Sequence, residues 1–154
     1  MPLSSKDLEA FLKNQNVKHK ILFHGETYSA EKASRELGIS LEHVAKTVVF
    51  VNEKKEPLIV VVSGGRKVNQ DKLAKTLGFR KLRLATGEEV LSHTGYEAGA
   101  VPPVGHVKQL PAVVDESLLS RERVYAGGGA VNATLEISPL DIVRLLNAKV
   151  MKVP

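Results

Sequence analysis

Two apolar segments joined by a short polar stretch constrain the fold of this chain more than any other feature. Residues 47–51 are rich in β-branched side chains, residues 52–57 are polar and turn-like, and residues 58–62 are apolar throughout. This pattern predicts a β-hairpin. Because a strand without polar positions is typically buried on both faces, residues 58–62 are expected to lie inside a sheet that is covered on each side.

Helix and strand signals surround the hairpin. Residues suited to begin a helix precede five amphipathic segments, and they are Ser5, Ser29, Asn69 or Asp71, Thr86 and Ser138. Short strands are expected at residues 21–23, 82–84, 112–114, 124–126 and 134–137. A chain of 154 residues is of ordinary single-domain length. The pattern therefore predicts one α+β domain over residues 1–154 with a mixed sheet.

The amino-acid composition limits the kinds of functional site that this chain can contain. The chain has no cysteine, which excludes a disulfide scaffold, a zinc site with cysteine ligands and a thiol nucleophile. The 22 basic and 17 acidic residues give a formal net charge of +5, which favours anionic partners such as RNA. No signal peptide or membrane-length apolar run is evident, so a soluble cytoplasmic protein is expected.

A loop rich in glycine and proline is the most informative candidate for function. Residues 94–106 include Gly95, Gly99, Pro102, Pro103 and Gly105. Glycine allows a ligand to approach the backbone closely, and free N–H groups in such a loop can bind an anion or polarise a carbonyl. A structural Ω-loop is an equally good interpretation of the pattern alone.

Two further features are candidates for a binding site. Lys46 immediately precedes the apolar hairpin, where it could hold a phosphate or remain solvated. Residues 127–129 are all glycine and predict a tight turn or the second wall of a ligand cleft. The five histidines lack metal-ligand spacing and are predicted to be surface side chains. Neither a metal nor a cofactor is expected.

Three motifs together resemble the YbaK family of trans-editing proteins, which are related to the insertion domain of prolyl-tRNA synthetase. Lys46-Thr47 before an apolar strand resembles the lysine motif of that family. The segment from Thr94 through Gly99 to Pro103 resembles its Gly-x-x-x-Pro loop. The glycine run after Tyr125 and the following segment to Asp141 resemble its C-terminal part. The likeness extends from about the second helix to Val150.

This resemblance implies a fold and an activity. It implies a curved, partly barrel-like mixed sheet flanked by helices, and hydrolysis of the ester between an amino acid and the 3′-terminal adenosine of a mischarged tRNA. Lys46 would anchor the adenosine or phosphate, and the backbone of Gly99 would polarise the ester carbonyl without a metal. The implied partners are the tRNA acceptor end and an aminoacyl-tRNA synthetase.

The resemblance also nominates residues for substrate binding. They are Tyr28, Thr47, Gly95, Tyr96, Ala100, Val101, Pro102, Pro103, Gly127, Gly128 and Thr134. Members that edit cysteinyl-tRNA carry a serine where this chain has Gly127 and an acidic residue where it has Thr134. Both departures argue against cysteine specificity. A non-catalytic module of the same fold that binds tRNA or a nucleotide is the alternative function, and a deacylase of small-molecule esters is a third.

Overall fold

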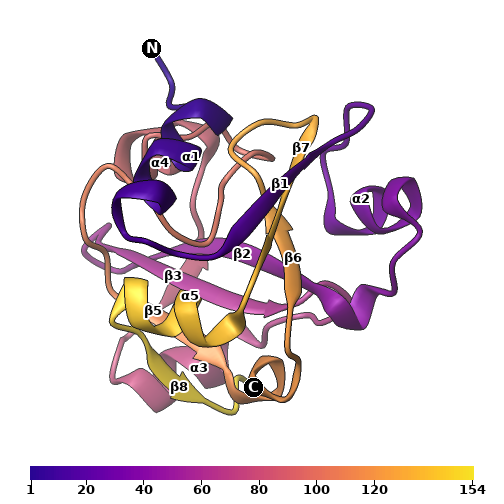
Figure 1. Ribbon diagram of the computed structural model, residues 1–154. Coiled ribbons are helices and arrows are strands. Elements are labelled where there is room, and N and C mark those ends of the chain that lie inside the picture. The colour runs from indigo at the N-terminus through magenta and orange to yellow at the C-terminus, as the bar shows by residue number, and fades with distance from the viewer.

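One eight-stranded mixed sheet organises the protein, and the computed structural model describes all residues 1–154 (Figure 1). The strands are β1 (His19–Phe23), β2 (Val44–Asn52), β3 (Pro57–Ser63), β4 (Leu82–Leu84), β5 (Ala112–Asp115), β6 (Val124–Gly127), β7 (Ala133–Ile137) and β8 (Lys149–Met151). The α-helices are α1 (Ser5–Asn14), α2 (Ala30–Leu37), α3 (Gln70–Leu77), α4 (Gly87–Thr94) and α5 (Pro139–Leu146). Two short 3₁₀ helices are η1 (Leu41–His43) and η2 (Glu116–Ser120). The predicted α+β class is confirmed.

The predicted hairpin forms the centre of the sheet. The strands run in the order β1-β7-β6-β2-β3-β5-β8, and β4 pairs with the far end of β2. Strands β2 and β3 are antiparallel, with Ala45 opposite Ser63 and Val51 opposite Pro57. Strand β2 also pairs in parallel with β6 and antiparallel with β4. The sheet is therefore mixed, and the β2–β3 hairpin carries strands on both of its edges.

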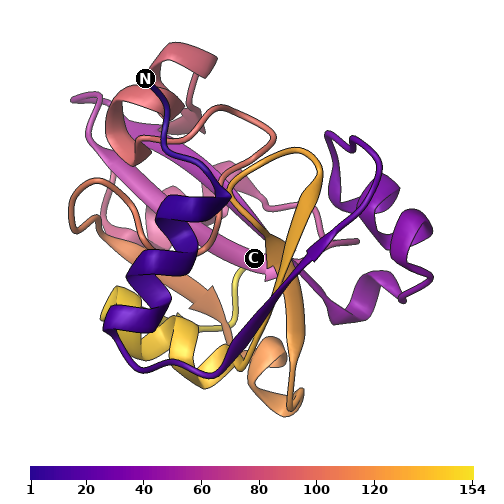
Figure 2. The same cartoon turned by 45° about the horizontal axis from the view of Figure 1, so that its top comes forward.

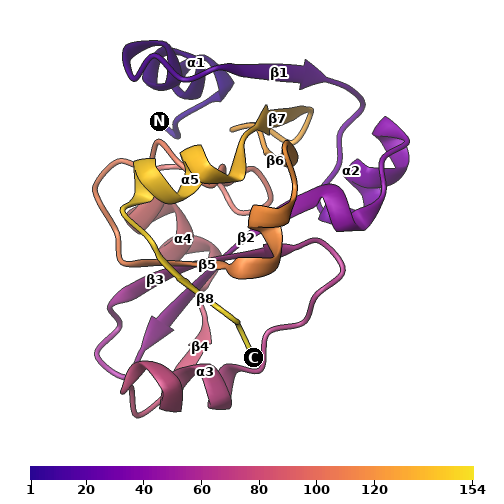
Figure 3. The same ribbon diagram turned by 60° about the horizontal axis from the view of Figure 1, so that its bottom comes forward.

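Strand β3 is buried on both faces, as its apolar sequence predicts. Ile59 and Val61 lie in a hydrophobic cluster of 19 residues, while Val60 and Val62 lie in a second cluster of nine. Helices α1 and α5 contribute side chains to the first cluster and α3 to the second. Figure 3 shows α1 and α5 on one side of β2 and β3 and α3 on the other.

Most α-helices begin directly after the capping residue predicted for them, and α1 is the exception. Ser29 and Asn69 each accept a hydrogen bond from a backbone N–H of the first helical turn, and Thr86 forms a capping box with Glu89. Helix α1 is capped by Ser4 and not by Ser5 as predicted. The reason is Asp7, whose carboxylate accepts the Ser4 N–H at 2.7 Å and so completes a capping box one residue earlier.

Some elements depend on tertiary pairing and were not predicted. Strand β8 has only three residues and exists because it pairs in parallel with β5. Helix α2 stands apart from the other helices, to one side of the sheet (Figures 1 and 2). None of the helices has both the length and the apolar character that a membrane crossing requires.

Candidate functional site

A cavity of about 480 Å³ opens where β2, β6 and β7 meet the start of α2 and the loop that follows α4. Seven of the residues nominated from the sequence line it, and they are Tyr28, Lys46, Thr47, Gly99, Val101, Gly127 and Thr134. These residues are widely separated in the sequence. The structure therefore gathers the lysine motif, the Gly-x-x-x-Pro loop and the glycine run around one space.

A row of residues crosses the sheet at this cavity. Thr134 of β7 is paired with Gly127 of β6. Lys46 of β2 lies one residue beyond the pair formed by Ala45 and Ala126, and is therefore beside Gly127. Since neighbouring strands are about 4.8 Å apart, the backbones of Thr134 and Lys46 are about 10 Å apart. Gly127 has no side chain, and the backbone carbonyl of Val101 lies over it in the middle of this row.

Lys46 is half-buried in the cavity wall, and its ammonium group donates a hydrogen bond to the backbone carbonyl of Arg66. Burial lowers the pKa of Lys46, the nearby Glu31 carboxylate acts in the opposite direction, and the positive charges of Arg66 and Lys67 lower it further. Glu31 also lines the cavity. An ammonium group fixed in this way can bind a phosphate or a polarised oxygen.

The loop after α4 carries backbone donors that the chain itself does not use. The N–H groups of Ala98, Gly99 and Val101 make no hydrogen bond within the protein, and all three residues line the cavity. A turn within the loop is closed by the Ala100 N–H, which donates to the Glu97 carbonyl at 3.0 Å. Gly99 has φ +89°, a left-handed conformation that favours glycine. Such free, fixed N–H groups suit an oxyanion or carbonyl oxygen.

Six nominated residues do not line the cavity, and they are Gly95, Tyr96, Ala100, Pro102, Pro103 and Gly128. Gly95 ends α4 with φ +86°, and its backbone carbonyl accepts a hydrogen bond from Leu3 N–H. Pro102 and Pro103 are buried, and the His106 ring donates to the Pro102 carbonyl. Five of the six belong to the loop after α4 and Gly128 to the turn between β6 and β7, and none of them is among the residues that line the cavity.

Tyr96 is fully buried beneath the loop, and its hydroxyl has no hydrogen-bond partner. Burial, together with the negative charge of Asp7, raises the pKa of Tyr96 to about 12. Removing an unpaired buried hydroxyl relieves its desolvation cost. We therefore expect Tyr96→Phe to raise the free energy of unfolding by about 1 kcal/mol in urea titrations. The exposed Tyr28→Phe should change it by less than about 0.5 kcal/mol, and a less stable Tyr96→Phe would contradict this assignment.

The absence of side chains in the glycine run lets other segments of the backbone pack closely against it. A Cβ on Gly127 would lie 2.3 Å from the carbonyl oxygen of Val101, and a Cβ on Gly128 would lie 2.6 Å from the carbonyl carbon of Ala133. Gly129 has φ +88° and donates its N–H to the Ala100 carbonyl at 3.1 Å. The run is therefore both the predicted tight turn and a cavity wall, since Gly127 lines the cavity.

The Gly127 contact predicts that a side chain at this position displaces the loop. We expect Gly127→Ser to lower the free energy of unfolding by about 1–3 kcal/mol, because the Val101 carbonyl must move. Urea denaturation measures this change. Gly87→Ala is a suitable control because nothing lies within 4 Å of its added methyl group. A Gly127→Ser protein as stable as the parent would show that the loop adjusts without cost.

His24 does not line the cavity but contacts a residue of its wall. The five histidines were predicted to be surface side chains, but none is fully exposed, and the His24 ring bonds to Thr134 Oγ1 at 2.8 Å. His106 is also enclosed, and burial lowers its pKa. No sequence signal links His24 to Thr134, which lies in a strand 110 positions later. No three His, Asp or Glu side chains gather closely enough to hold a metal ion.

Comparisons with known proteins agree with this arrangement. The sequence profile of the aminoacyl-tRNA editing domain matches residues 24–145. EbsC of Enterococcus faecalis, a candidate Cys-tRNA(Pro)/Cys-tRNA(Cys) deacylase, is 30% identical over 79% of this chain and 74% of its own length. Proline–tRNA ligase of Thermodesulfovibrio yellowstonii is 30% identical over 81% of this chain, which corresponds to 21% of that enzyme.

Two solved structures have the same fold. The hypothetical protein APE2540 superposes with a TM-score of 0.87 at 34% identity, over 96% of this chain and 98% of its own. A candidate trans-editing enzyme for prolyl tRNA synthetase gives a TM-score of 0.83 at 31% identity, over 97% and 95% of the two chains. The profile match covers most of the chain, including every cavity residue nominated from the sequence. This chain therefore belongs to the aminoacyl-tRNA editing domain family.

Proposed function

We propose that this chain deacylates a mischarged aminoacyl-tRNA in trans, by hydrolysing the ester at the 3′-terminal adenosine. The observation that carries the proposal is the pairing of unused backbone donors with a fixed cation in one cavity. The N–H groups of Ala98, Gly99 and Val101 make no hydrogen bond within the protein, and Lys46, whose ammonium donates to the Arg66 carbonyl, lines the same cavity. A cavity of about 480 Å³ is of the size that commonly holds a small ligand.

The reaction needs little beyond these groups. Water adds to the ester carbon, the bond to the ribose oxygen breaks, and that oxygen leaves with a proton, giving a free amino acid and an uncharged tRNA. The Gly99 N–H donates to the carbonyl oxygen as negative charge develops there, and one such donor is typically worth about 2.7–4 kcal/mol. A ribose hydroxyl of the substrate can orient the attacking water. Lys46 holds the terminal adenosine or its phosphate.

The identity of the partner follows from this chemistry. The substrate is the acceptor end of a tRNA that carries the wrong amino acid, and the net charge of +5 favours its approach. An aminoacyl-tRNA synthetase is a candidate second partner, and the activity is expected in the cytoplasm, where its substrate is made. Gly127 and Thr134 disfavour a cysteinyl substrate, because the serine and acid of cysteine-editing members are replaced.

A deacylation screen tests the proposal. Purified protein is incubated with tRNAs that are each charged with a different amino acid, and loss of the ester is compared with spontaneous hydrolysis. We expect at least one mischarged tRNA to be deacylated faster than its spontaneous rate. Tight binding to the acceptor end with no hydrolysis of any ester would instead identify a non-catalytic binding module. Equal rates on tRNA and on a free aminoacyl-adenosine would indicate a deacylase of small esters.

A further inference from the structure

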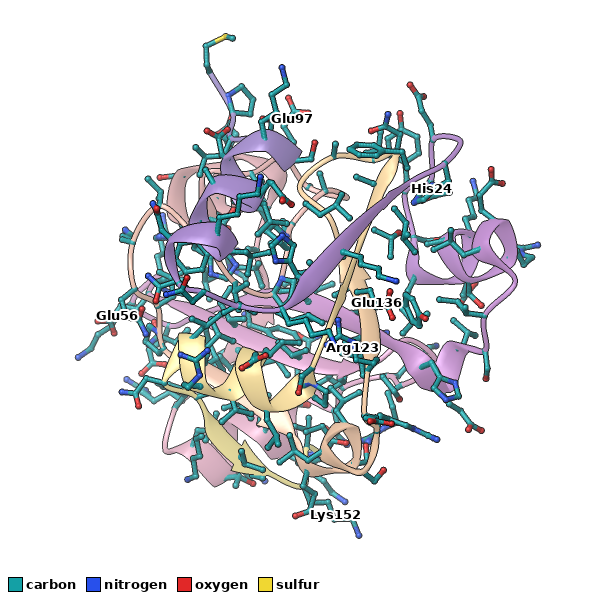
Figure 4. The ribbon with its side chains drawn as sticks, in the orientation of Figure 1. His24, Glu56, Glu97, Arg123, Glu136 and Lys152 are labelled. Atoms are coloured by element: carbon teal, nitrogen blue, oxygen red, sulfur yellow. The ribbon has the colours of Figure 1, made fainter.

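His24 and Thr134 form a hydrogen-bonded pair, and Thr134 lines the cavity two strands away from Lys46. His24 follows β1 on the side of the sheet that faces α2 (Figure 4). Its Nε2 lies 2.8 Å from Thr134 Oγ1, and its Nδ1 lies 2.6 Å from the carbonyl oxygen of Gly25. Thr134 is only 5% exposed and lines the cavity. The hydroxyl therefore has one hydrogen-bond partner in the protein and belongs to a residue of the cavity wall.

The Gly25 carbonyl fixes the direction of these hydrogen bonds. A carbonyl oxygen only accepts, so Nδ1 of the His24 ring must carry a hydrogen. In the neutral imidazole Nε2 is then an acceptor, and the Thr134 hydroxyl donates its single hydrogen to it. With its hydrogen occupied in this way, Thr134 can offer only lone pairs to a ligand.

A second acceptor lies beside the first. The Val101 carbonyl receives no hydrogen bond from any group of the chain. Its oxygen is 2.3 Å from the point where a Cβ on Gly127 would lie, and Gly127 is directly opposite Thr134. Side chains of directly opposed residues lie on the same face of a sheet with Cβ atoms about 5 Å apart. Two acceptors that receive no hydrogen from the chain therefore lie over two paired positions of the sheet, Thr134 Oγ1 at its own residue and the Val101 carbonyl over Gly127.

We propose that this acceptor corner, formed by Thr134 Oγ1 and the Val101 carbonyl, binds the α-ammonium group of the aminoacyl ester. An ammonium group carries only donors and prefers several acceptors in a place sheltered from water. This inference rests on the proposed deacylase function and adds the group by which the site recognises the amino acid. Thr134 and Val101 bind that group, while His24 is a positioning residue that orients the Thr134 hydroxyl.

The distance to Lys46 fits an extended substrate. The Thr134 and Lys46 backbones are about 10 Å apart across three neighbouring strands. Lys46 is tied to the Arg66 carbonyl on the β3 side, away from Thr134. The two positive charges, one of the protein and one of the substrate, are thus held at opposite ends. The free N–H groups of the Gly99 loop are available to the ester carbonyl between them.

The test removes the ammonium group from the substrate and the hydroxyl from the protein. Alanyl, seryl and propionyl 3′-esters of the same tRNA are compared, each relative to its spontaneous hydrolysis, since propionyl is alanyl without its amino group. Thr134→Val, which keeps the shape, should slow the alanyl and seryl esters alike by about 10- to 100-fold. The propionyl ester should be slowed far less. Thr134→Ser should recover most of the loss, and His24→Ala should slow the alanyl ester in the same direction as Thr134→Val.

Other outcomes would overturn the assignment in distinguishable ways. If Thr134→Val slows only the seryl ester, the corner binds a side-chain hydroxyl. If it slows all three esters equally, Thr134 has a structural role. Should the parent protein hydrolyse neither these esters nor any ester of the full screen, the proposed function fails, and binding then decides the inference. In that case the non-hydrolysable 3′-amide analogues of alanyl- and propionyl-adenosine are compared by calorimetry, and equal affinities would exclude an ammonium subsite.

Discussion

Replacing Gly99 with alanine is expected to slow deacylation by about 100- to 1000-fold, the usual effect of losing one oxyanion donor. Gly99 has φ +89°, and its added methyl group would lie 3.5 Å from the Tyr28 ring, which leaves room for the atom itself. The effect therefore comes from the backbone, because alanine rarely adopts this conformation and the loop must turn its N–H groups elsewhere. Single-turnover deacylation of the best substrate from the screen measures the loss.

Gly78→Ala is the matched control for this substitution. Gly78 ends α3 with φ +81°, has nothing within 4 Å of the added methyl group and does not line the cavity. Both variants should lose about 1–3 kcal/mol of stability from the left-handed conformation, but Gly78→Ala should keep the parental rate. If Gly99→Ala deacylated at that rate as well, the loop amides would have no role in the reaction.

Lys46→Ala is expected to lower kcat/KM for deacylation by about 10- to 100-fold, the effect of removing one charge-assisted hydrogen bond to substrate. The reason is that Lys46 is the cation that the structure fixes in the cavity wall, through the Arg66 carbonyl. Lys72→Ala is the control, since Lys72 is exposed on α3 and outside the cavity. Full activity of Lys46→Ala on every active substrate would refute the anchoring role.

The pKa of Lys46 adds a pH dependence to this prediction. Burial lowers that pKa, so the ammonium loses its proton at a lower pH than an exposed lysine does. Substrate anchoring should therefore weaken as the pH rises through this value, after correction for spontaneous hydrolysis. Lys46→Arg should move the decline to higher pH, because a guanidinium stays charged. Identical alkaline profiles for the two proteins would show that another group controls the decline.

The sequence predicted secondary structure correctly where the interactions that form it join residues only a few positions apart. The hairpin at β2 and β3 and the capping residues Ser29 and Asn69 were predicted, because each depends on neighbouring positions. The cap of α1 lies at Ser4 because a capping box needs its acid three residues after the cap, and Asp7 has that spacing from Ser4 and not from Ser5. Strand β8 could not be predicted, since three residues become a strand only when β5 lies beside them.

The same distinction between local and long-range contacts separates what could and could not be predicted about the site. The sequence alone determined the class of fold, and through motif resemblance it nominated Lys46, Gly99, Gly127 and Gly128, of which all but Gly128 line the cavity. It could not separate the inner and outer sides of the loop after α4, where Gly99 lines the cavity and Tyr96 lies in the core. Only the tertiary structure decided that His24 orients Thr134 and that Val101 lies over Gly127. Such contacts join strands and loops that are distant in sequence, and no local pattern records which of them will meet.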